Sequence, residues 1–229
     1  MKFFRLLYST FLDALFPRPT AEREVFSYTP KEALAKLPKA PKFTEEYENM
    51  HAIFAYKDER VSRLVWAIKY KRMEVAVKIG GYALLQELEK SDSIHTIIIP
   101  MPVTERRRRE RGYNQCELLL EEIKSLYENN PLNGATVAKF IFENKLLVRT
   151  HHDSYHKLKD RADRLEDAKG IFSIDQNVLA KLSGDNPDML NTQVIIIDDV
   201  ITTGSTMREA AKTLHAAGFM SIQGLALAH

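Results

Sequence analysis

Short apolar runs alternate with segments of helical spacing from about residue 50 to the C-terminus. Six runs are typical of buried strands: HAIFAY, IHTIIIP, KFIFENKLLVRT (one strand or two), KGIFSI, QVIIIDDV and SIQGLALAH. Four segments between them have apolar residues every three or four positions and predict helices: RVSRLVWAIKYKR, AVKIGGYALLQELEK, NQCELLLEEIKSLYENN and STMREAAKTLHAAG. Continuous apolar strands that alternate with helices predict an α/β fold, a mainly parallel sheet with helices on both faces.

The first 48 residues follow a different pattern. In residues 1–18 the apolar side chains fall near helical spacing, and Asp13 interrupts them without a small-residue cleavage site downstream. A docking helix is therefore predicted rather than a signal peptide or a membrane anchor. Residues 17–46 hold five prolines and no sustained periodicity, which is typical of a linker or an irregular cap. We divide the chain into an N-terminal helix and cap, residues 1–48, and a main domain, residues 49–229.

Composition narrows the class of protein. The chain has 229 residues, enough for one α/β domain with a small appendage. The formal net charge is +2, which gives no overall attraction to nucleic acid or to an anionic membrane. Cys116 is the one cysteine, so an internal disulfide and a cysteine-rich zinc site are excluded. These features fit a reducing, cytoplasmic location.

The stretch IIIDDVITTGST, residues 195–206, carries the most specific chemistry. A strand ends in Asp198 and Asp199, at the edge of a parallel sheet where ligands bind. The turn that follows opens a helix, whose first amides and short hydroxyls suit a phosphate monoester: Thr202, Thr203, Gly204, Ser205 and Thr206. The spacing predicts a ribose 5-phosphate site, with the acids at the sugar diol. The alternative is a solvated strand end in which Ser205 or Thr206 only caps the helix. A Walker loop is disfavoured because no Gly-Lys-Ser/Thr follows.

Four stretches resemble a known family. VIIIDDVITTGSTMREAAKTLHAAG is similar to the 5-phosphoribosyl 1-pyrophosphate (PRPP) signature of type I phosphoribosyltransferases. Three others resemble the ComF family within that group: IIIPMPVTERRRRERGYNQCELL, HAIFAYKDERVSRLVWAIKYKR and LLVRTHHDSYHKLKDRADRLEDAKGIF. The resemblance runs in order from about residue 50 to the C-terminus, and LDALFP resembles the family's opening. It implies a Rossmann-like type I phosphoribosyltransferase fold, with a small N-terminal helical or irregular segment.

The N-terminal segment departs from that family. Many ComF-like proteins carry a cysteine-rich zinc ribbon after the opening, whereas residues 17–46 contain no cysteine. Metal-dependent folding of this segment is therefore not expected.

The chain after IHTIIIP is the expected pyrophosphate site. Met101, Pro102 and Val103 would form a tight loop whose amides face the pyrophosphate, and the resemblance implies a cis peptide there. The run ERRRRER holds five arginines, of which Arg107 and Arg111 match the family pattern as phosphate ligands. We interpret Arg106 and Arg108 as a solvated basic face. Contact between the run and a nucleic-acid backbone is an alternative.

Two further segments are candidate ligand-side or lid regions. Asn114 could cap the helix that it opens, and the resemblance makes Asn114 and Gln115 ligand-side candidates, whereas Tyr113 is equally suited to packing. Residues 149–169 are polar and match the family's arm, a lid in which Arg149, Arg161 and Arg164 are the basic positions. Three histidines raise a metal-site alternative, which has neither cysteine partners nor fixed helical spacing: His151, His152 and His156. His156 stands near where the family tends to have glutamine.

The favoured hypothesis is a phosphoribosyltransferase that transfers the phosphoribosyl group of PRPP to an unknown nitrogen nucleophile and releases pyrophosphate. Asp198 and Asp199 would orient the diol and stabilise an oxocarbenium-like transition state. Mg²⁺ is the expected cofactor, held mainly by PRPP oxygens rather than by a protein cage. The alternative is a non-catalytic, ComF-like accessory protein of DNA uptake on the same scaffold, and direct binding of single-stranded DNA is a third hypothesis. The sequence specifies neither the acceptor nor the oligomeric state.

Overall fold

The computed structural model describes residues 19–42, 49–91, 95–129, 139–150, 170–185 and 192–229. The docking helix predicted in residues 1–18 and most of the predicted lid lie outside these residues. Among the described helices, none combines the length and the apolarity that crossing a lipid bilayer requires.

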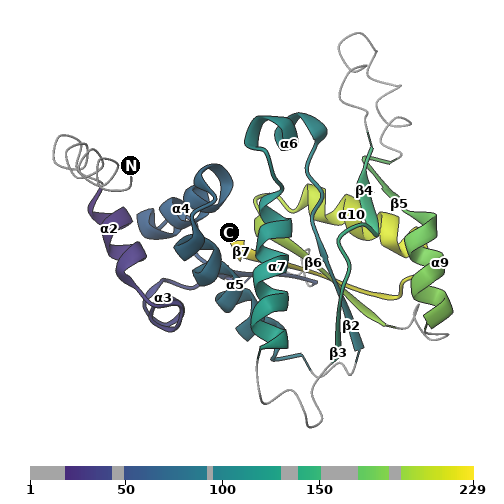
Figure 1. Cartoon of the computed structure of the whole chain (residues 1–229), viewed down its shortest axis with the longest axis horizontal. Helices are drawn as coiled ribbons and strands as arrows, with labels where there is room; N and C mark the ends of the chain where they lie inside the picture. The colour runs from purple at the N-terminus through teal and green to yellow at the C-terminus, as the bar shows by residue number, and fades with distance from the viewer. Residues whose placement is uncertain (1–18, 43–48, 92–94, 130–138, 151–169, 186–191) are drawn as a thin grey trace, which may run out of the picture.

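A five-stranded sheet forms the centre of the molecule (Figure 1). Its strands, all parallel, run in the order β1-β7-β6-β2-β3. Their bounds are Met50–Phe54 (β1), His95–Pro100 (β2), Lys139–Phe142 (β3), Gln193–Val200 (β6) and Ser221–Ala228 (β7). The predicted α/β fold with a parallel sheet is confirmed and is consistent with the Rossmann-like type I phosphoribosyltransferase fold that the resemblance implied.

Each face of the sheet is covered by its own apolar core. Ile195 and Ile197 of β6 pack on one face with α4 (Glu59–Trp66), α5 (Glu74–Leu88) and α7 (Gln115–Glu128). Val194 and Ile196 pack on the other face with α10 (Ser205–Ala216). Because successive residues of a strand point to opposite faces, the unbroken apolar run of β6 serves both cores. Figure 1 shows α5 and α7 on one side of the sheet and α10 on the other.

A π-helix, η2 (Ala67–Lys71), continues directly from α4. It ends at Arg72, the one described non-glycine residue with positive φ, at 47°. The helix predicted over RVSRLVWAIKYKR is therefore present, but its last turn is wider than an α-helical turn.

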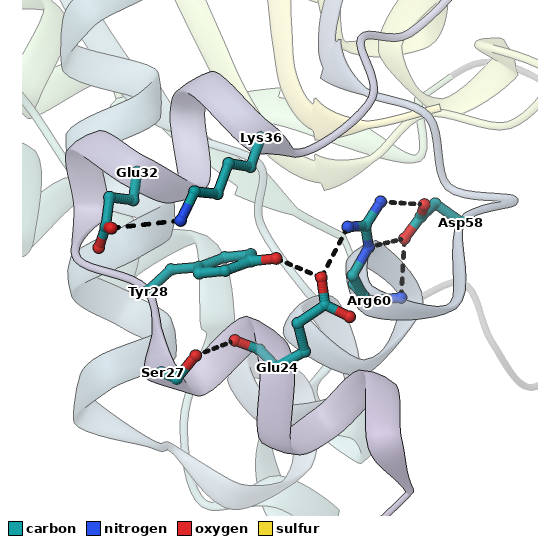
Figure 2. Close-up of polar contacts among 7 residues, drawn as sticks. All are labelled: Glu24, Ser27, Tyr28, Glu32, Lys36, Asp58 and Arg60. Carbon is teal, nitrogen blue, oxygen red and sulfur yellow. Dashed lines mark hydrogen bonds and ion pairs between the residues drawn. The ribbon is translucent and has the colours of Figure 1, made fainter.

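The N-terminal cap is helical rather than irregular. α2 (Thr20–Ser27) and α3 (Pro30–Lys36) pack against α4 and α5, and Val25 and Ala33 are fully buried there. Figure 2 shows the polar contacts behind this packing. Arg60, on α4, donates to Glu24 of α2 and to Asp58, and the Tyr28 hydroxyl also donates to Glu24.

A second sheet, of two strands, is formed by the chain after β3. β4 (Leu147–Arg149) and β5 (Phe172–Ile174) lie in two segments that were predicted to be extended, and the structure pairs them as antiparallel strands, a pairing that was not predicted from the sequence. Besides α2 and α3, two further described helices were not predicted, namely α6 (Glu105–Arg111) within the arginine run and α9 (Gln176–Asp185) after β5.

Candidate functional site

The carboxyl ends of β2 and β6 lie side by side at one edge of the sheet. Pro100 of β2 pairs with Ile197 of β6, and the Met101 N–H donates to the Ile197 carbonyl at 2.8 Å. Asp198 and Asp199 come next on β6, so both acids occupy the strand end, where parallel sheets bind ligands. The loops after the two strands therefore start next to each other.

Asp199 faces inward and is paired with a lysine. It has the same parity as Ile197 along the strand, and its side chain is 4% exposed. Its Oδ2 lies 3.3 Å from Nζ of Lys69, a residue of η2 that is 21% exposed. The contact is an ion pair, since this oxygen accepts no hydrogen bond from the described residues. One of the two predicted diol-binding acids thus already has a cationic partner.

Asp198 is half-buried and lines the turn that follows the strand. Its Oδ1 accepts a hydrogen bond from the Asp199 N–H at 2.8 Å and one from the Cys116 thiol at 3.4 Å. Burial, followed by repulsion from Asp199, raises the pKa of Asp198 from its ordinary 3.8 to about 7. The two adjacent carboxyls therefore have different environments, one paired with an ammonium and one disfavoured as an anion.

The turn after β6 opens α10 without a side-chain cap. Gly204 is the N-cap residue, at φ 67°, a conformation that strains residues with a Cβ atom. The alternative in which Ser205 or Thr206 caps the helix is therefore wrong. Thr202, Thr203 and Ser205 are exposed, and the hydroxyls of Thr203 and Ser205 lie 3.0 Å apart. Asp198 and residues 200–207 line a hollow of about 40 Å³. The first amides of α10 are thus available to an anion.

The loop after β2 is shaped by backbone contacts. Met101 is buried, and its carbonyl accepts a hydrogen bond from Asn114 Nδ2 at 3.1 Å. The expected cis peptide is absent, because every peptide bond among the described residues is trans. Instead the Met101 N–H extends the ladder to β6, while Pro102 and Val103 are half-buried beside it.

The arginine run forms α6, capped by Thr104, whose Oγ1 accepts from the Arg107 N–H. Residues 105–110 are exposed and Arg111 is half-buried. Arg107 is exposed on this helix, whereas Arg111 lies 4.9 Å above the Tyr70 ring and donates to Gln115 Oε1 at 2.8 Å. Arg106 and Arg109 lie 3.9 Å from glutamates one turn away, and Arg108 pairs with Glu117 of α7. The solvated face inferred for Arg106 and Arg108 agrees with their exposure.

The segment after α6 is a structural junction. Asn114 is 1% exposed and caps α7, since its Oδ1 accepts from the Cys116 N–H at 2.9 Å. The capping role predicted for Asn114 is confirmed, and both the oxygen and the nitrogen of its buried side chain make hydrogen bonds within the protein. Gln115 is also buried. Neither Asn114 nor Gln115 therefore presents its side chain on the exposed surface of the site.

A larger cavity of about 650 Å³ adjoins the loop after β2. Pro102 and Val103 line one side of it, and Arg149 of β4 and Asp175 line another. Arg149 also lies over the Phe172 ring. Of the lid arginines, Arg161 and Arg164 lie outside the described residues, as do the three histidines of the arm. Of the three predicted lid arginines, Arg149 is thus the one in the described part of the chain, and it lines the cavity beside the loop.

Cys116, Asp198 and Asp199 bring possible metal ligands within 4.8 Å of one another. The set does not suit Mg²⁺, which prefers oxygen ligands alone. One member is a buried thiol whose pKa is raised well above its ordinary value by burial and by the two acids, and Lys69 already faces Asp199. The residues present therefore do not form a magnesium cage.

Lys69 was not predicted as a site residue. It lies within the helix predicted over RVSRLVWAIKYKR, and no separate role was predicted for it. A signal was present, because Lys69 follows Val65 by four positions and so falls on the apolar stripe, where lysine is rare unless it is paired.

Comparison with known proteins gives relatives but no family, since no family model matches the chain. It is 32% identical to competence protein F of Haemophilus influenzae over 131 residues, 57% of this chain and 49% of that protein. It is 25% identical to the DNA utilization protein YhgH of Escherichia coli O157:H7 over 168 residues, 71% of this chain and 64% of that protein. Competence protein ComFC of Bacillus subtilis is 28% identical over 120 residues, 52% of this chain and 38% of that protein. The matches thus span from about a third to two thirds of these relatives.

Proposed function

Because the named relatives support assignment of this chain to the ComF family, we propose that it is an accessory protein of DNA uptake or DNA use that binds a 5-phosphorylated ribose of the PRPP class. One observation carries the ligand part of the proposal. Two carboxyls and an uncapped, hydroxyl-rich helix start lie within one turn of each other at the end of β6.

The ligand would be held at three places. Its 5-phosphate would take hydrogen bonds from the first amides of α10 and from the hydroxyls of residues 202–206. The sugar diol would face Asp198 and Asp199. The pyrophosphate would lie against the loop Met101–Pro102–Val103, with Arg107 and Arg111 as its cations. Magnesium, when bound, would neutralise the pyrophosphate oxygens of the ligand rather than sit in a protein cage.

Calorimetry tests the ligand part. PRPP with magnesium chloride should release heat on the wild-type protein, and Gly204→Val should lower the affinity by on the order of tenfold or more, because a branched residue strains the φ 67° turn. Thr213→Val is the matched control on α10, since the Thr213 hydroxyl donates to the Glu209 carbonyl of the same helix. Absence of heat with the folded wild-type protein refutes PRPP binding.

Phosphoribosyl transfer is the second candidate function. The cavity of about 650 Å³ beside Pro102 and Val103 favours it, since an acceptor would need room next to the pyrophosphate loop. A nitrogen lone pair would form the bond to the anomeric carbon, the bond from that carbon to pyrophosphate would break, and the nitrogen would lose its proton. Asp198 and Asp199 would stabilise the positive charge that develops on the ribose ring.

Pyrophosphate release separates the two candidates. Wild-type protein, PRPP and magnesium would be incubated with a panel of nucleobases and amines. A transferase should release pyrophosphate with at least one acceptor, and Asp199→Asn should nearly abolish the release. Binding of PRPP without release for the whole panel would favour the non-catalytic accessory function.

A surface of exposed aromatic and basic side chains favours direct contact with single-stranded DNA as part of the accessory function in DNA uptake. Trp66 and Tyr70 are 40% and 57% exposed, with Lys71 lying 4.6 Å above Trp66 and Arg111 beside Tyr70. Rings on which bases can stack, interleaved with cations, are typical of single-strand binding surfaces. The arginines of α6 would extend this surface.

Fluorescence anisotropy with a labelled oligonucleotide tests this contact. Affinity should fall steeply with salt, and replacing residues 106–109 by glutamine should flatten that dependence. Lys124→Gln and Lys212→Gln, which remove exposed charges on α7 and α10, serve as controls. No binding at low salt would eliminate direct DNA contact and leave PRPP binding untouched.

A further inference from the structure

Lys69 lies on a short π-helical turn that other parts of the chain hold in place. We propose that Lys69 positions Asp199 and balances its charge so that an anionic sugar phosphate can approach, and that Tyr113 fixes the turn that presents Lys69. The inference rests on the proposed phosphoribosyl ligand and adds two residues to its site.

The turn itself is unusual. η2 follows α4 without a break, and the Arg72 N–H closes it by donating to the Ala67 carbonyl. The chain then leaves through the left-handed conformation of Arg72, which costs free energy for a residue with a side chain. Single π-turns and positive φ values gather at functional positions because only surrounding contacts can maintain them. η2 therefore needs partners that hold its shape.

Tyr113 is the first of these partners. Its hydroxyl donates to the Ile68 carbonyl at 2.8 Å and accepts from the Arg72 N–H at 3.0 Å, so a single oxygen joins the start of the turn to its end. The Arg72 guanidinium also lies 5.9 Å from the centre of the Tyr113 ring. Lys69 is the residue directly after Ile68, so the tyrosine fixes the backbone beside the lysine.

The cap supplies a second partner from the opposite direction. Glu22 of α2 is 5% exposed, and its carboxylate lies 3.8 Å from Lys71 Nζ. The Lys71 ammonium also contacts the Trp66 ring. Lys71 therefore faces the cap while Lys69, two positions earlier, faces the sheet. The wider turn is held from both sides with its two lysines directed apart.

The charge balance explains what Lys69 would do for the ligand. Asp198 and Asp199 are adjacent, and a phosphorylated sugar is itself an anion, so two carboxylates without a cation would repel it. The Lys69 ammonium at 3.3 Å offsets the charge of Asp199 and holds its Oδ2 in one place. Because both side chains are largely removed from water, this attraction is screened less than a surface pair would be.

A charge-rescue series tests the proposal by calorimetry with ribose 5-phosphate, and with PRPP and magnesium. Lys69→Met should weaken both ligands by on the order of tenfold or more, since it leaves Asp199 without its cation. The double variant Lys69→Met, Asp199→Asn should bind several-fold more tightly than Lys69→Met alone, because it removes both charges of the pair. A lysine that served only the fold would give no such rescue.

Two further variants complete the series. Tyr113→Phe keeps the ring and removes the hydroxyl, so it should weaken the same ligands several-fold while the melting temperature shows a folded protein. Lys78→Met, which removes an exposed lysine of α5 paired with Glu74, should leave affinity unchanged. If the wild type binds and Lys69→Met binds equally well, or the double variant is weaker than Lys69→Met, the inference alone is overturned. If the wild type itself fails to bind, the proposed function falls and the inference with it.

Discussion

Asp198 is partly buried next to a second acid, Asp199, and its ionised form therefore lowers the stability of the folded protein. The pKa of Asp198 is raised to about 7, so the folded state binds its proton more tightly than the unfolded state does. The resulting stability is fully present below the ordinary value of 3.8 and is lost as pH rises to about 7. Above that pH the folded protein carries an anion that its surroundings disfavour, which is typical of functional sites.

Asp198→Asn should therefore stabilise the protein at neutral and higher pH. We expect a gain of about 2 to 4 kcal/mol in the free energy of unfolding above about pH 7.5, since a rise in the pKa from 3.8 to about 7 corresponds to about 4 kcal/mol at most. The gain should shrink toward zero below about pH 4. The asparagine oxygen can still accept from the Asp199 N–H. Urea denaturation across this pH range measures the difference, with exposed Glu121→Gln on α7 as the control. An equal effect of Asp198→Asn at every pH would contradict the pKa shift as its cause.

Cys116 should be unreactive in the folded state. Burial raises the pKa of its thiol well above the ordinary value, and the charges of Asp198 and Asp199 raise it further, so little thiolate forms near neutral pH. We expect a disulfide reagent to modify the native protein at least a hundredfold more slowly than the protein in urea. Absorbance of the released thiolate gives both rates, and rapid modification of the native chain would show that the thiol is accessible.

The sequence predicted the positions of residues whose surroundings are set by their neighbours in the chain. Asn114 as a helix cap and the two acids at a strand end follow from local pattern, and the structure has them there. The position of Lys69 on the apolar stripe indicates that it is paired but not with which residue, because its partner Asp199 is 130 positions further along the chain. The different environments of Asp198 and Asp199 were missed for the same reason, since they depend on what covers each face of the sheet.

The helices α5 and α7 approach each other closely at two glycines. A Cβ placed on Gly81 would come within 2.4 Å of Glu122 Cγ and 2.8 Å of its Cβ, and one on Gly80 would meet Leu119. Both glycines lie inside the helix predicted over AVKIGGYALLQELEK, where glycine lowers helix propensity. In the structure they permit the contact that packs α7, and with it Cys116 and the Asn114 cap, against the sheet.

Gly81→Ala should therefore destabilise the protein despite the higher helix propensity of alanine. We expect a loss of about 1 to 2 kcal/mol, because overpacking against Glu122 exceeds the propensity gain of about 1 kcal/mol. Gly184→Ala on α9 is the matched comparison. A Cβ there has no described neighbour within 4 Å, so a gain of about 0.5 kcal/mol is expected. Chemical denaturation measures both, and a stabilising Gly81→Ala would show that the two helices can separate at no cost.

Elements with an apolar pattern were predicted, and helices in segments where no such pattern was recognised were not. The five strands of the sheet and the three long helices α5, α7 and α10 follow from apolar spacing. In residues 17–46 the prolines were interpreted as breakers, yet Pro30 occupies the first turn of α3, behind a capping box of Thr29 and Glu32. α6 was not predicted because all of its residues are charged and give no apolar stripe.

The helical cap packs into the apolar core that covers one face of the sheet. Val25, Ala33 and Leu37 enter the same core as α4 and α5. Arg60 ties α2 to α4 through Glu24, and the pKa of Glu24 is lowered by its hydrogen bonds to Tyr28 and Arg60 (Figure 2). The cap meets the candidate site through Glu22 and Lys71, so its integrity bears on the π-turn as well as on its own helices.

Apolar burial, rather than a metal, should hold the cap in place, and hydrogen exchange measures this directly. In the wild-type protein, amides of residues 20–36 should stay protected after treatment with EDTA, because residues 17–46 contain no cysteine to bind zinc.

Val25→Asp places an acid in a fully buried position, at a cost of about 3 kcal/mol or more. It should remove protection from residues 20–36 while β2 and β6 keep theirs. Lys31→Asp, on the exposed surface of α3, should change neither. Loss of wild-type protection in EDTA would show that a metal stabilises the cap, and loss of protection in β2 and β6 with Val25→Asp would show that the cap and the sheet unfold as one unit.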